Sequence, residues 1–295
     1  MKQTLVNLNP ADYEHPFDRA ALNRVKAIPV LPSVMNFTLN WAAVNWKILT
    51  MCGNNFHVTR DACPDLYELS DEVFKTLQLN FAPDLYMEQS YYINAYTTGH
   101  EEKAFICVST GAVDKLSDEE LQFVIGHEAG HIKSGHVLYH VMLAYLTAIV
   151  SKVPGSGLLK VPLMYWNRMS EFTADRAGLL ACQDLNAALS AIMKMSGLPE
   201  KYYKTASVDG FIKQARDFVE TNSHGVNSAM RLIEIIDEDH PWTVIRASEL
   251  IKWYENGDYQ RILDGARGRI CPQCKSPISD TVTECPICGN TKFDD

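Results

Sequence analysis

The sequence predicts a mainly helical α+β domain at residues 1–264, followed by a small separate module at residues 265–295. Most of the first part repeats apolar residues at helical spacing, which is typical of amphipathic helices. One stretch, Ile93–Thr110, has two short β-prone runs around a polar turn and predicts a small sheet. The small, basic segment Gly265–Arg269 then precedes four cysteines, so we expect a hinge at this point.

Two helices are predicted before the sheet. Apolar residues at helical spacing indicate the first at Asp18–Val25, and Pro29 follows its end. The second is predicted at Pro32–Met51 and is expected to break at Gly53. Three asparagines and a lysine within this second segment make it a poor candidate for a membrane span.

The strongest helix pattern begins after the predicted sheet. Ser117-Asp-Glu-Glu120 is a capping box, in which the serine hydroxyl accepts from the third helical amide and Glu120 accepts from the amide of Ser117. Apolar residues then recur at helical spacing on a stripe that is expected to face the core. The stripe consists of Leu121, Val124, Ile125, Ala129 and Ile132.

The rest of the chain up to Tyr259 is predicted to be helical with short connections. Val137–Val150 is apolar, but it is 14 residues long and contains His140. A membrane span needs roughly 17 to 25 apolar residues, so we expect a core helix and no transmembrane span. A further helix is predicted at Met164–Cys182.

Composition and charge narrow the class of protein. With 46% hydrophobic and 21% charged residues, the chain is expected to fold around a hydrophobic core. A net charge of −9 and a pI near 5.5 argue against binding to the phosphate backbone of nucleic acids. Residues 1–26 contain no basic start followed by an apolar stretch, so we expect no secretory signal and a cytoplasmic location.

The segment His127-Glu-Ala-Gly-His131 contains the HExxH pattern. Two histidines four residues apart lie on one helix face, so both rings can reach a single zinc ion at about 2.0–2.1 Å. Glu128 is then placed to take a proton from a water molecule that the zinc ion activates. Gly130 leaves room for another element beside the metal. The alternative is an ordinary helix with two histidines on a polar face.

A catalytic zinc ion has three protein ligands and one open position. Glu171-Phe-Thr-Ala-Asp175, in the next predicted helix, offers two carboxylates on one helix face. We predict Glu171 as the third ligand and Asp175 as the acceptor of a ring N–H from a ligand histidine. Taken alone, this pair would be a solvated acidic stripe; beside HExxH it predicts a catalytic zinc site.

Two segments, LSDEELQFVIGHEAGHIKSGH at 116–136 and SEFTADRAG at 170–178, resemble the gluzincin peptidases that include the heat-shock membrane protease HtpX and the CAAX prenyl endopeptidases. Asn94-Ala95, the strand Ile106–Thr110, and His240-Pro241 with Arg246 extend this resemblance over roughly residues 14–255. The resemblance implies a zincin-like fold and a zinc metalloendopeptidase that hydrolyses peptide bonds in protein substrates. The absence of clear spanning helices departs from the membrane-embedded members.

The resemblance also implies roles for residues outside the two motifs. His240 would donate to the oxyanion of the transition state and Arg246 would order the carboxylates, although His240-Pro241 is also a common helix start. The rim strand would bind an extended substrate through main-chain hydrogen bonds, although its residues are equally compatible with a purely structural strand. These substrate-binding candidates are Asn94, Ala95, Ile106, Cys107, Val108 and Ser109. His136 is expected to be structural.

The carboxyl-terminal module contains two CxxC pairs, Cys271–Cys274 and Cys285–Cys288, with ten residues between them. Four thiolates at this spacing suit a closed structural zinc site, and the segment resembles a zinc ribbon. A redox disulfide is the alternative. Residues 266–295 contain four basic and four acidic residues, which favours a protein partner or a stabilising role over nucleic acid. The other four cysteines are expected to be buried free thiols.

Two further functions are compatible with the same sequence. The chain is either a latent or chaperone-like relative of these proteases, with its cleft closed by a loop, by the module or by a fourth ligand, or a zinc-ribbon adaptor with a non-catalytic helical scaffold. The main prediction is a protease with two zinc ions, one catalytic and one structural, that acts on a protein or peptide substrate.

Overall fold

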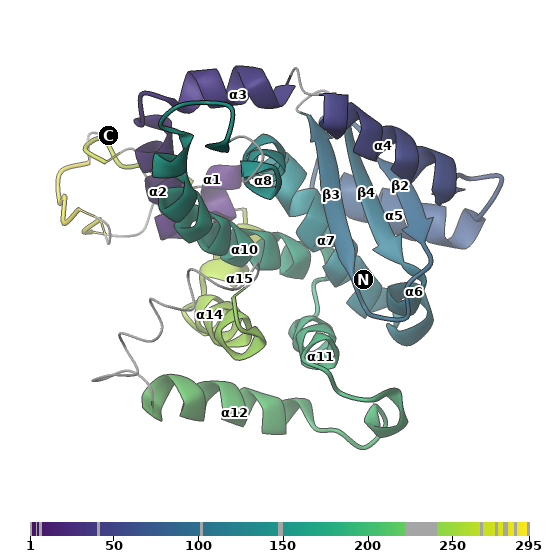
Figure 1. The fold of residues 1–295 in the computed structure, drawn as a ribbon. Helices are drawn as coiled ribbons and strands as arrows, with labels where there is room; N and C mark the ends of the chain where they lie inside the picture. Colours follow the sequence, from purple (N-terminus) through teal and green to yellow (C-terminus); the bar gives the residue numbers. More distant parts are fainter. Residues whose placement is uncertain are drawn as a thin grey trace.

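The computed structural model describes residues 2–3, 5, 8–39, 42–100, 103–146, 150–221, 241–265, 268–274, 277–279, 283–285 and 288–293. In these residues the fold is mainly helical with one four-stranded sheet, as predicted (Figure 1). The helices before the metal-site motif are α1 Pro10–Tyr13, α2 Pro16–Lys26, α3 Leu31–Leu39, α4 Ala42–Asn54, α5 Pro64–Thr76 and α6 Thr110–Lys115. Those that follow are α7 Asp118–Lys133, α8 Val137–Ala144, η1 Ser156–Leu159, α10 Lys160–Cys182, α11 Leu185–Met195, η2 Glu200–Tyr202, α12 Val208–Thr221, α14 Thr243–Glu255 and α15 Asp258–Leu263.

The sheet has the strand order β1-β2-β4-β3. Its strands are β1 Phe56–Val58, β2 Asp84–Glu88, β3 Ala95–His100 and β4 Lys103–Ser109. The antiparallel pair β3–β4 confirms the sheet predicted at Ile93–Thr110, whereas β1 and the parallel partner β2 were not predicted. Alternate residues of β4 serve two layers: Ile106 packs in the main core, while Cys107 packs against α4 with Met51.

The two helices that contain the site motifs pack against each other at small residues. A Cβ atom added to Gly130 would lie 2.5 Å from Cβ of Ala177, and one added to Gly126 would lie 2.5 Å from Cβ of Ala181. Such distances leave no room for a side chain, so α7 and α10 approach almost backbone to backbone. The capping box at the start of α7 is confirmed, because Ser117 and Glu120 accept from each other's amides.

Two predicted helices differ from those observed. Instead of one helix at Pro32–Met51, the structure has α3 and α4, and α4 continues through Gly53 to Asn54. No neighbouring atom lies within 4 Å of a Cβ built on Gly53, and glycine costs a helix only about 1 kcal/mol, so packing of α4 on the sheet outweighs it. The apolar segment from Val137 forms the short core helix α8. In the described part of the chain, no helix is both long and apolar enough to cross a membrane.

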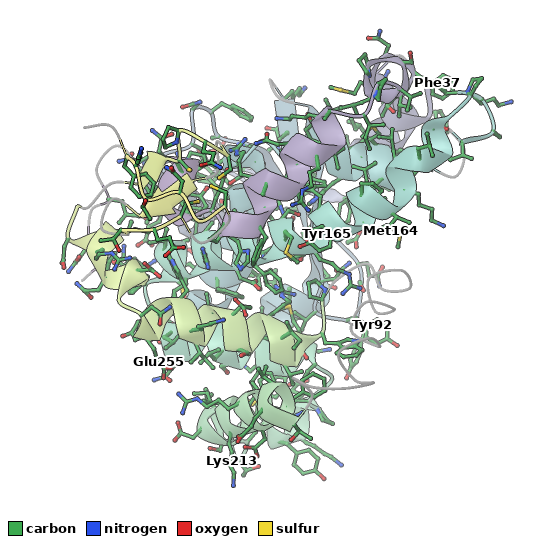
Figure 2. All side chains as sticks on the ribbon, turned by 90° about the vertical axis from the view of Figure 1, so that its left-hand side faces the viewer. Phe37, Tyr92, Met164, Tyr165, Lys213 and Glu255 are labelled. Carbon is green, nitrogen blue, oxygen red and sulfur yellow. The ribbon has the colours of Figure 1, made fainter. Side chains whose placement is uncertain are left out.

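Helices α11, α12 and α14 pack together at the end of the molecule opposite α3 (Figure 1). Figure 2 shows Phe37 of α3 and Lys213 of α12 at opposite ends, with Met164 and Tyr165 of α10 between them. Helix α14 contacts α10, α11 and α12, so it connects this end to the helix that contains Glu171. The prediction of helices up to Tyr259 is thus confirmed for the described residues.

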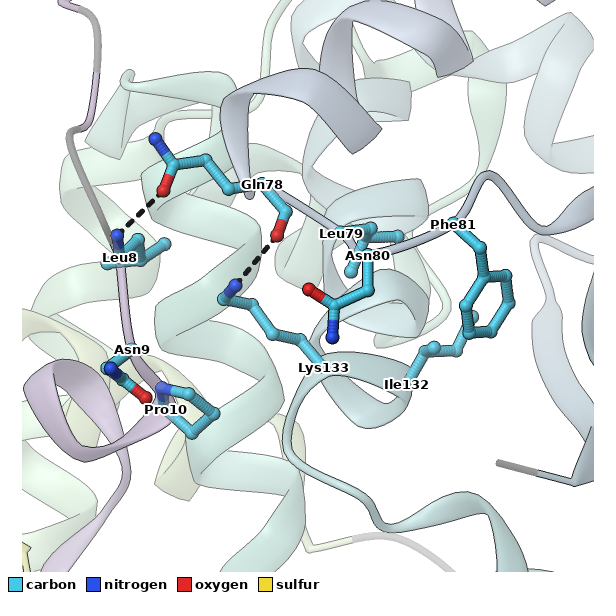
Figure 3. A pocket seen from close by; sticks show the side chains of 9 residues that line it. All are labelled: Leu8, Asn9, Pro10, Gln78, Leu79, Asn80, Phe81, Ile132 and Lys133. Atoms are coloured by element: carbon cyan, nitrogen blue, oxygen red, sulfur yellow. Dashed lines mark hydrogen bonds between the residues drawn. The ribbon is translucent and has the colours of Figure 1, made fainter. Parts of the chain in front are cut away.

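A glutamine at the end of α5 holds the amino-terminal segment in place. Gln78 has a φ of 53°, and its side-chain amide accepts from the amide of Leu8 at 2.8 Å (Figure 3). The same side chain donates to the carbonyl of Leu5. Lys133 donates to the main-chain carbonyl of Gln78 at 2.9 Å, beside a hollow of about 450 Å³. These bonds fix the segment that leads into α1.

The carboxyl-terminal module contains the antiparallel strands β5 Gly268–Ile270 and β6 Pro277–Ser279. Strand β5 contacts α1, and β6 contacts α1 and α2 (Figure 1). The eight cysteines all lie in the described part of the chain, and none of them forms a disulfide there; Cys107 and Cys182 are buried, whereas Cys52 and Cys63 are only partly buried. The division into a domain at 1–264 and a module at 265–295 stays a prediction.

Candidate metal centre

Helices α7 and α10 bring together the three predicted ligands of the first zinc site. Nε2 of His127 lies 3.2 Å from Nε2 of His131, and the two carboxylate oxygens of Glu171 lie 3.4 Å and 3.3 Å from these nitrogens. All three side chains are buried. The i, i+4 spacing on α7 and the close approach of α10 place the three donors around one point.

The spacing of these donors fits zinc. Donors that are about 2.0–2.1 Å from a tetrahedral zinc ion lie about 3.3 Å from one another, which matches the distance between the two nitrogens and the distance from each nitrogen to one of the two oxygens of Glu171. In the described part of the chain, these three residues form one of two groups of His, Cys, Asp and Glu side chains that could hold a metal ion. A zinc ion held by these three residues would keep one further position for a water molecule or a substrate.

The ring of His127 is held at Nδ1 by the buried ion pair of Asp175 and Arg246. Its Nδ1 lies 2.9 Å from Oδ1 of Asp175, as the sequence predicts for a carboxylate that supports a ligand. Arg246, from α14, donates to both oxygens of Asp175, with Nε at 2.9 Å and Nη2 at 2.6 Å. The structure therefore brings Arg246 to the carboxylates; His240 lies outside the described residues.

Charge at this site favours a divalent cation. Three buried carboxylates, those of Glu128, Glu171 and Asp175, face two cationic side chains, Arg246 and His127, which still leaves a surplus of negative charge. Burial alone would lower the pKa of His127, but hydrogen bonds to Asp175 and Glu171 raise it to about 10. Burial lowers the pKa of His131. A metal ion must displace the proton of His127, so its affinity should fall at low pH.

Strand β3 supplies a residue that the sequence did not single out. Thr97 donates its hydroxyl to Oε2 of Glu128 at 2.7 Å, and its hydroxyl also lies 3.3 Å from the main-chain carbonyl of Glu128. This bond fixes the carboxylate that HExxH assigns as the base. A threonine in a strand gives no recognisable pattern, because its partner lies 31 residues away.

We predict that Thr97→Val lowers kcat by about 10-fold with little change in KM. Valine has the same shape but cannot donate, and hydrogen bonds to charged groups contribute about 1.5–3 kcal/mol. Steady-state kinetics on a fluorogenic peptide would measure the change. Thr97→Ser keeps the hydroxyl and should restore most of kcat; wild-type activity in Thr97→Val would contradict a role for this bond.

A cleft of about 640 Å³ opens beside the three donors. Its polar lining includes Asn94, Thr97, Glu128, His131 and Glu171, Ala95 also lines it, and further apolar residues come from α8 and α10. The predicted substrate strand needs a correction, because β4 is paired with β2 on one side and β3 on the other. Ile106, Cys107, Val108 and Ser109 are therefore structural: the first three are fully buried, and Ser109 accepts from the amide of Asn94.

The four cysteines of the module also gather around one point. Sγ of Cys271 lies 3.7 Å from Sγ of Cys288, and Sγ of Cys274 lies 3.6 Å from Sγ of Cys285. Donors about 2.3 Å from a tetrahedral zinc ion lie about 3.8 Å apart, so the spacing suits zinc, whereas a disulfide needs about 2.05 Å. The described residues of the module do not line the cleft beside Glu171.

Comparison with known proteins agrees with this geometry. Residues 63–254, which contain both α7 and α10, match the model of peptidase family M48. The chain belongs to peptidase family M48. This M48 membership confirms the resemblance to HtpX-like gluzincin peptidases and supports a metalloprotease role.

Relatives of this M48 peptidase cover the chain to different extents. It is 32% identical over 266 residues to the plastoglobule-localized metallopeptidase 48, chloroplastic, of Arabidopsis thaliana, covering 88% of this chain and 77% of that protein. It is 24% identical to a protease HtpX homolog of Ralstonia pickettii, over 76% of this chain and 85% of that protein. The match to protease HtpX homolog 2 of Methanosarcina mazei, at 28% identity, covers 40% of this chain and 51% of that protein. No solved structure gives a significant match.

Proposed function

We propose that this M48 chain is a zinc-dependent endopeptidase that hydrolyses peptide bonds in protein substrates. The observation that carries the proposal is the spacing of His127, His131 and Glu171, whose donors lie at 3.2–3.4 Å from one another beside an open cleft. This arrangement suits a catalytic ion, because three protein donors leave one position open. The closed group of four cysteines suits a structural ion instead.

Each residue of the centre has a proposed task. Zinc, when bound, supplies the Lewis acidity that activates water and polarises the peptide carbonyl. Glu128, fixed by Thr97, takes the proton of the attacking water and returns it to the leaving amine. Asp175 and Arg246 hold His127 in the tautomer that presents Nε2 to the ion.

Strand β3 is proposed to position the substrate. In the described sheet β3 is an edge strand, paired with β4 alone; its residues Ala95–Thr98 and the preceding Asn94 line the cleft. An extended peptide that adds to this edge would be held by main-chain hydrogen bonds, which tolerate many sequences. The side chains of Val141, Leu143 and Met164 across the cleft favour an apolar side chain in the substrate.

The proposal predicts metal-dependent cleavage of unfolded protein. Purified full-length protein should bind two zinc ions per chain and degrade casein, and a chelator should stop the cleavage before it removes the ion of the cysteine site. Zinc added back should restore activity. A protein with both ions bound that cleaves neither casein nor a peptide library would refute the proposal.

Two earlier expectations stay predictions. A protein partner for the cysteine module is compatible with its position against α1 and α2, and its described residues leave the cleft open. The plastoglobule-localized relative is named as chloroplastic, so it does not support the cytoplasmic location predicted for this chain.

A further inference from the structure

A second series of buried hydrogen bonds begins at Nδ1 of His131, the ring nitrogen that does not face Glu171. The other nitrogen, Nε2, faces Glu171, while Nδ1 lies 3.1 Å from Nδ1 of His136. Nε2 of His136 in turn lies 3.1 Å from Oδ2 of Asp18. His131, His136 and Asp18 are all at most 3% exposed. Because Asp18 belongs to α2, this series connects an amino-terminal helix to the metal centre.

The other partners of Asp18 fix where the hydrogens lie. Trp166 donates its indole N–H to Oδ1 at 2.8 Å, and Thr173 donates its hydroxyl to Oδ2 at 2.6 Å. The hydroxyl oxygen of Thr173 already accepts from the amide of His15, so its hydrogen points to Asp18. A carboxylate surrounded by donors acts only as an acceptor. Nε2 of His136 must therefore bear a hydrogen.

The same reasoning continues to the metal ligand. A neutral imidazole has one donor nitrogen and one acceptor nitrogen, so Nδ1 of His136 is the acceptor. It accepts the hydrogen on Nδ1 of His131. In this tautomer the lone pair on Nε2 of His131 is free to bind an ion.

We propose that Asp18 and His136 are positioning residues that hold His131 in the tautomer and orientation required for metal binding. The inference rests on the proposed zinc site. It gives each ligand imidazole a buried support of its own: Asp175 for His127, and His136 with Asp18 for His131. Supports of this kind raise metal affinity. His136 thus has a role at the centre beyond the structural one expected from the sequence.

The test compares two substitutions around Asp18 in the full-length protein. Asp18→Asn keeps the shape but lets an amide donate to Nε2 of His136, which reverses the order of donors and acceptors. Zinc affinity, measured by competition with a chromophoric chelator, should fall about 10- to 100-fold. Thr173→Val removes a different buried hydrogen bond to Asp18 and leaves the series intact, so its zinc affinity should stay within about 3-fold of wild type.

The outcomes separate this inference from the proposed function. Two zinc ions in the wild type with unchanged affinity in Asp18→Asn would overturn the positioning role alone, as would equal losses in both variants, which indicate general destabilisation. A wild type that binds zinc only at its cysteines would overturn the zinc site as well.

A second measurement needs no variant. Nitrogen-15 NMR of the histidine rings in the zinc-loaded wild type should show a hydrogen on Nε2 but not on Nδ1 of His136. It should also show a hydrogen on Nδ1 of His131. A hydrogen on Nδ1 of His136 would overturn the inference, because two donors would then face each other.

Discussion

Glu128→Gln is expected to lower kcat/KM for peptide cleavage by about 10²- to 10⁴-fold, the usual contribution of a general base. Glutamine has the size of glutamate and can still accept from Thr97, but it cannot take a proton from water. The three metal donors are unchanged, so the variant should bind zinc with the stoichiometry of the wild type. Cleavage of a fluorogenic peptide and metal analysis of the same sample would measure both.

Helix α7 offers a matched control for this substitution. Glu119→Gln makes the same chemical change at an exposed position of the first turn, away from the cleft, and should leave kcat/KM unchanged. If Glu128→Gln retained more than about a tenth of wild-type activity, the assignment of the base would be wrong.

Arg246→Met is expected to lower the free energy of unfolding of the metal-free protein by about 3–5 kcal/mol. It removes both hydrogen bonds that Arg246 donates to Asp175 and leaves the buried carboxylates of the centre with His127 as their neighbouring cation, which is not enough to balance them. Arg246 holds the pKa of Asp175 below its usual range, against the effect of burial. Urea unfolding monitored by circular dichroism would measure the loss.

Two further variants test whether the loss of stability in Arg246→Met comes from the buried ion pair with Asp175. Arg216→Met breaks an ion pair with Glu255 in which both side chains are more than half exposed, and it should cost less than about 1 kcal/mol. Adding Asp175→Asn to Arg246→Met removes the unpaired charge and should recover part of the stability. Equal losses from Arg246→Met and Arg216→Met would show that the buried pair has no special importance.

Local sequence patterns were sufficient to predict the helices of the site and its three donors. The capping box at Ser117 and the i, i+4 spacing of His127 and His131 depend on neighbouring residues, and such features are visible in a single sequence. Parallel pairing of β2 with β4 depends on residues far apart, so no local pattern indicated that β4 is central.

Two supporting residues of the centre, Asp18 and Thr97, were missed for the same reason, whereas Asp175 and Arg246 were predicted. Asp18 lies 155 residues from Thr173, and Thr97 lies 31 residues from Glu128. A buried aspartate in an amphipathic helix and a threonine in a strand have many ordinary explanations in sequence. Only the packing of α2 and β3 around α7 and α10 indicates their partners.

The contact between α7 and α10 has a consequence for how the two proposed zinc ions would exchange. Because Gly126 and Gly130 meet the alanines of α10 without intervening side chains, the distance between the donors is set by main chain that is buried and already ordered. An ion at the proposed catalytic site would then enter or leave without local refolding. A module of this size has little core of its own and depends on its ion to fold, so chelation should unfold it while the helical part stays native.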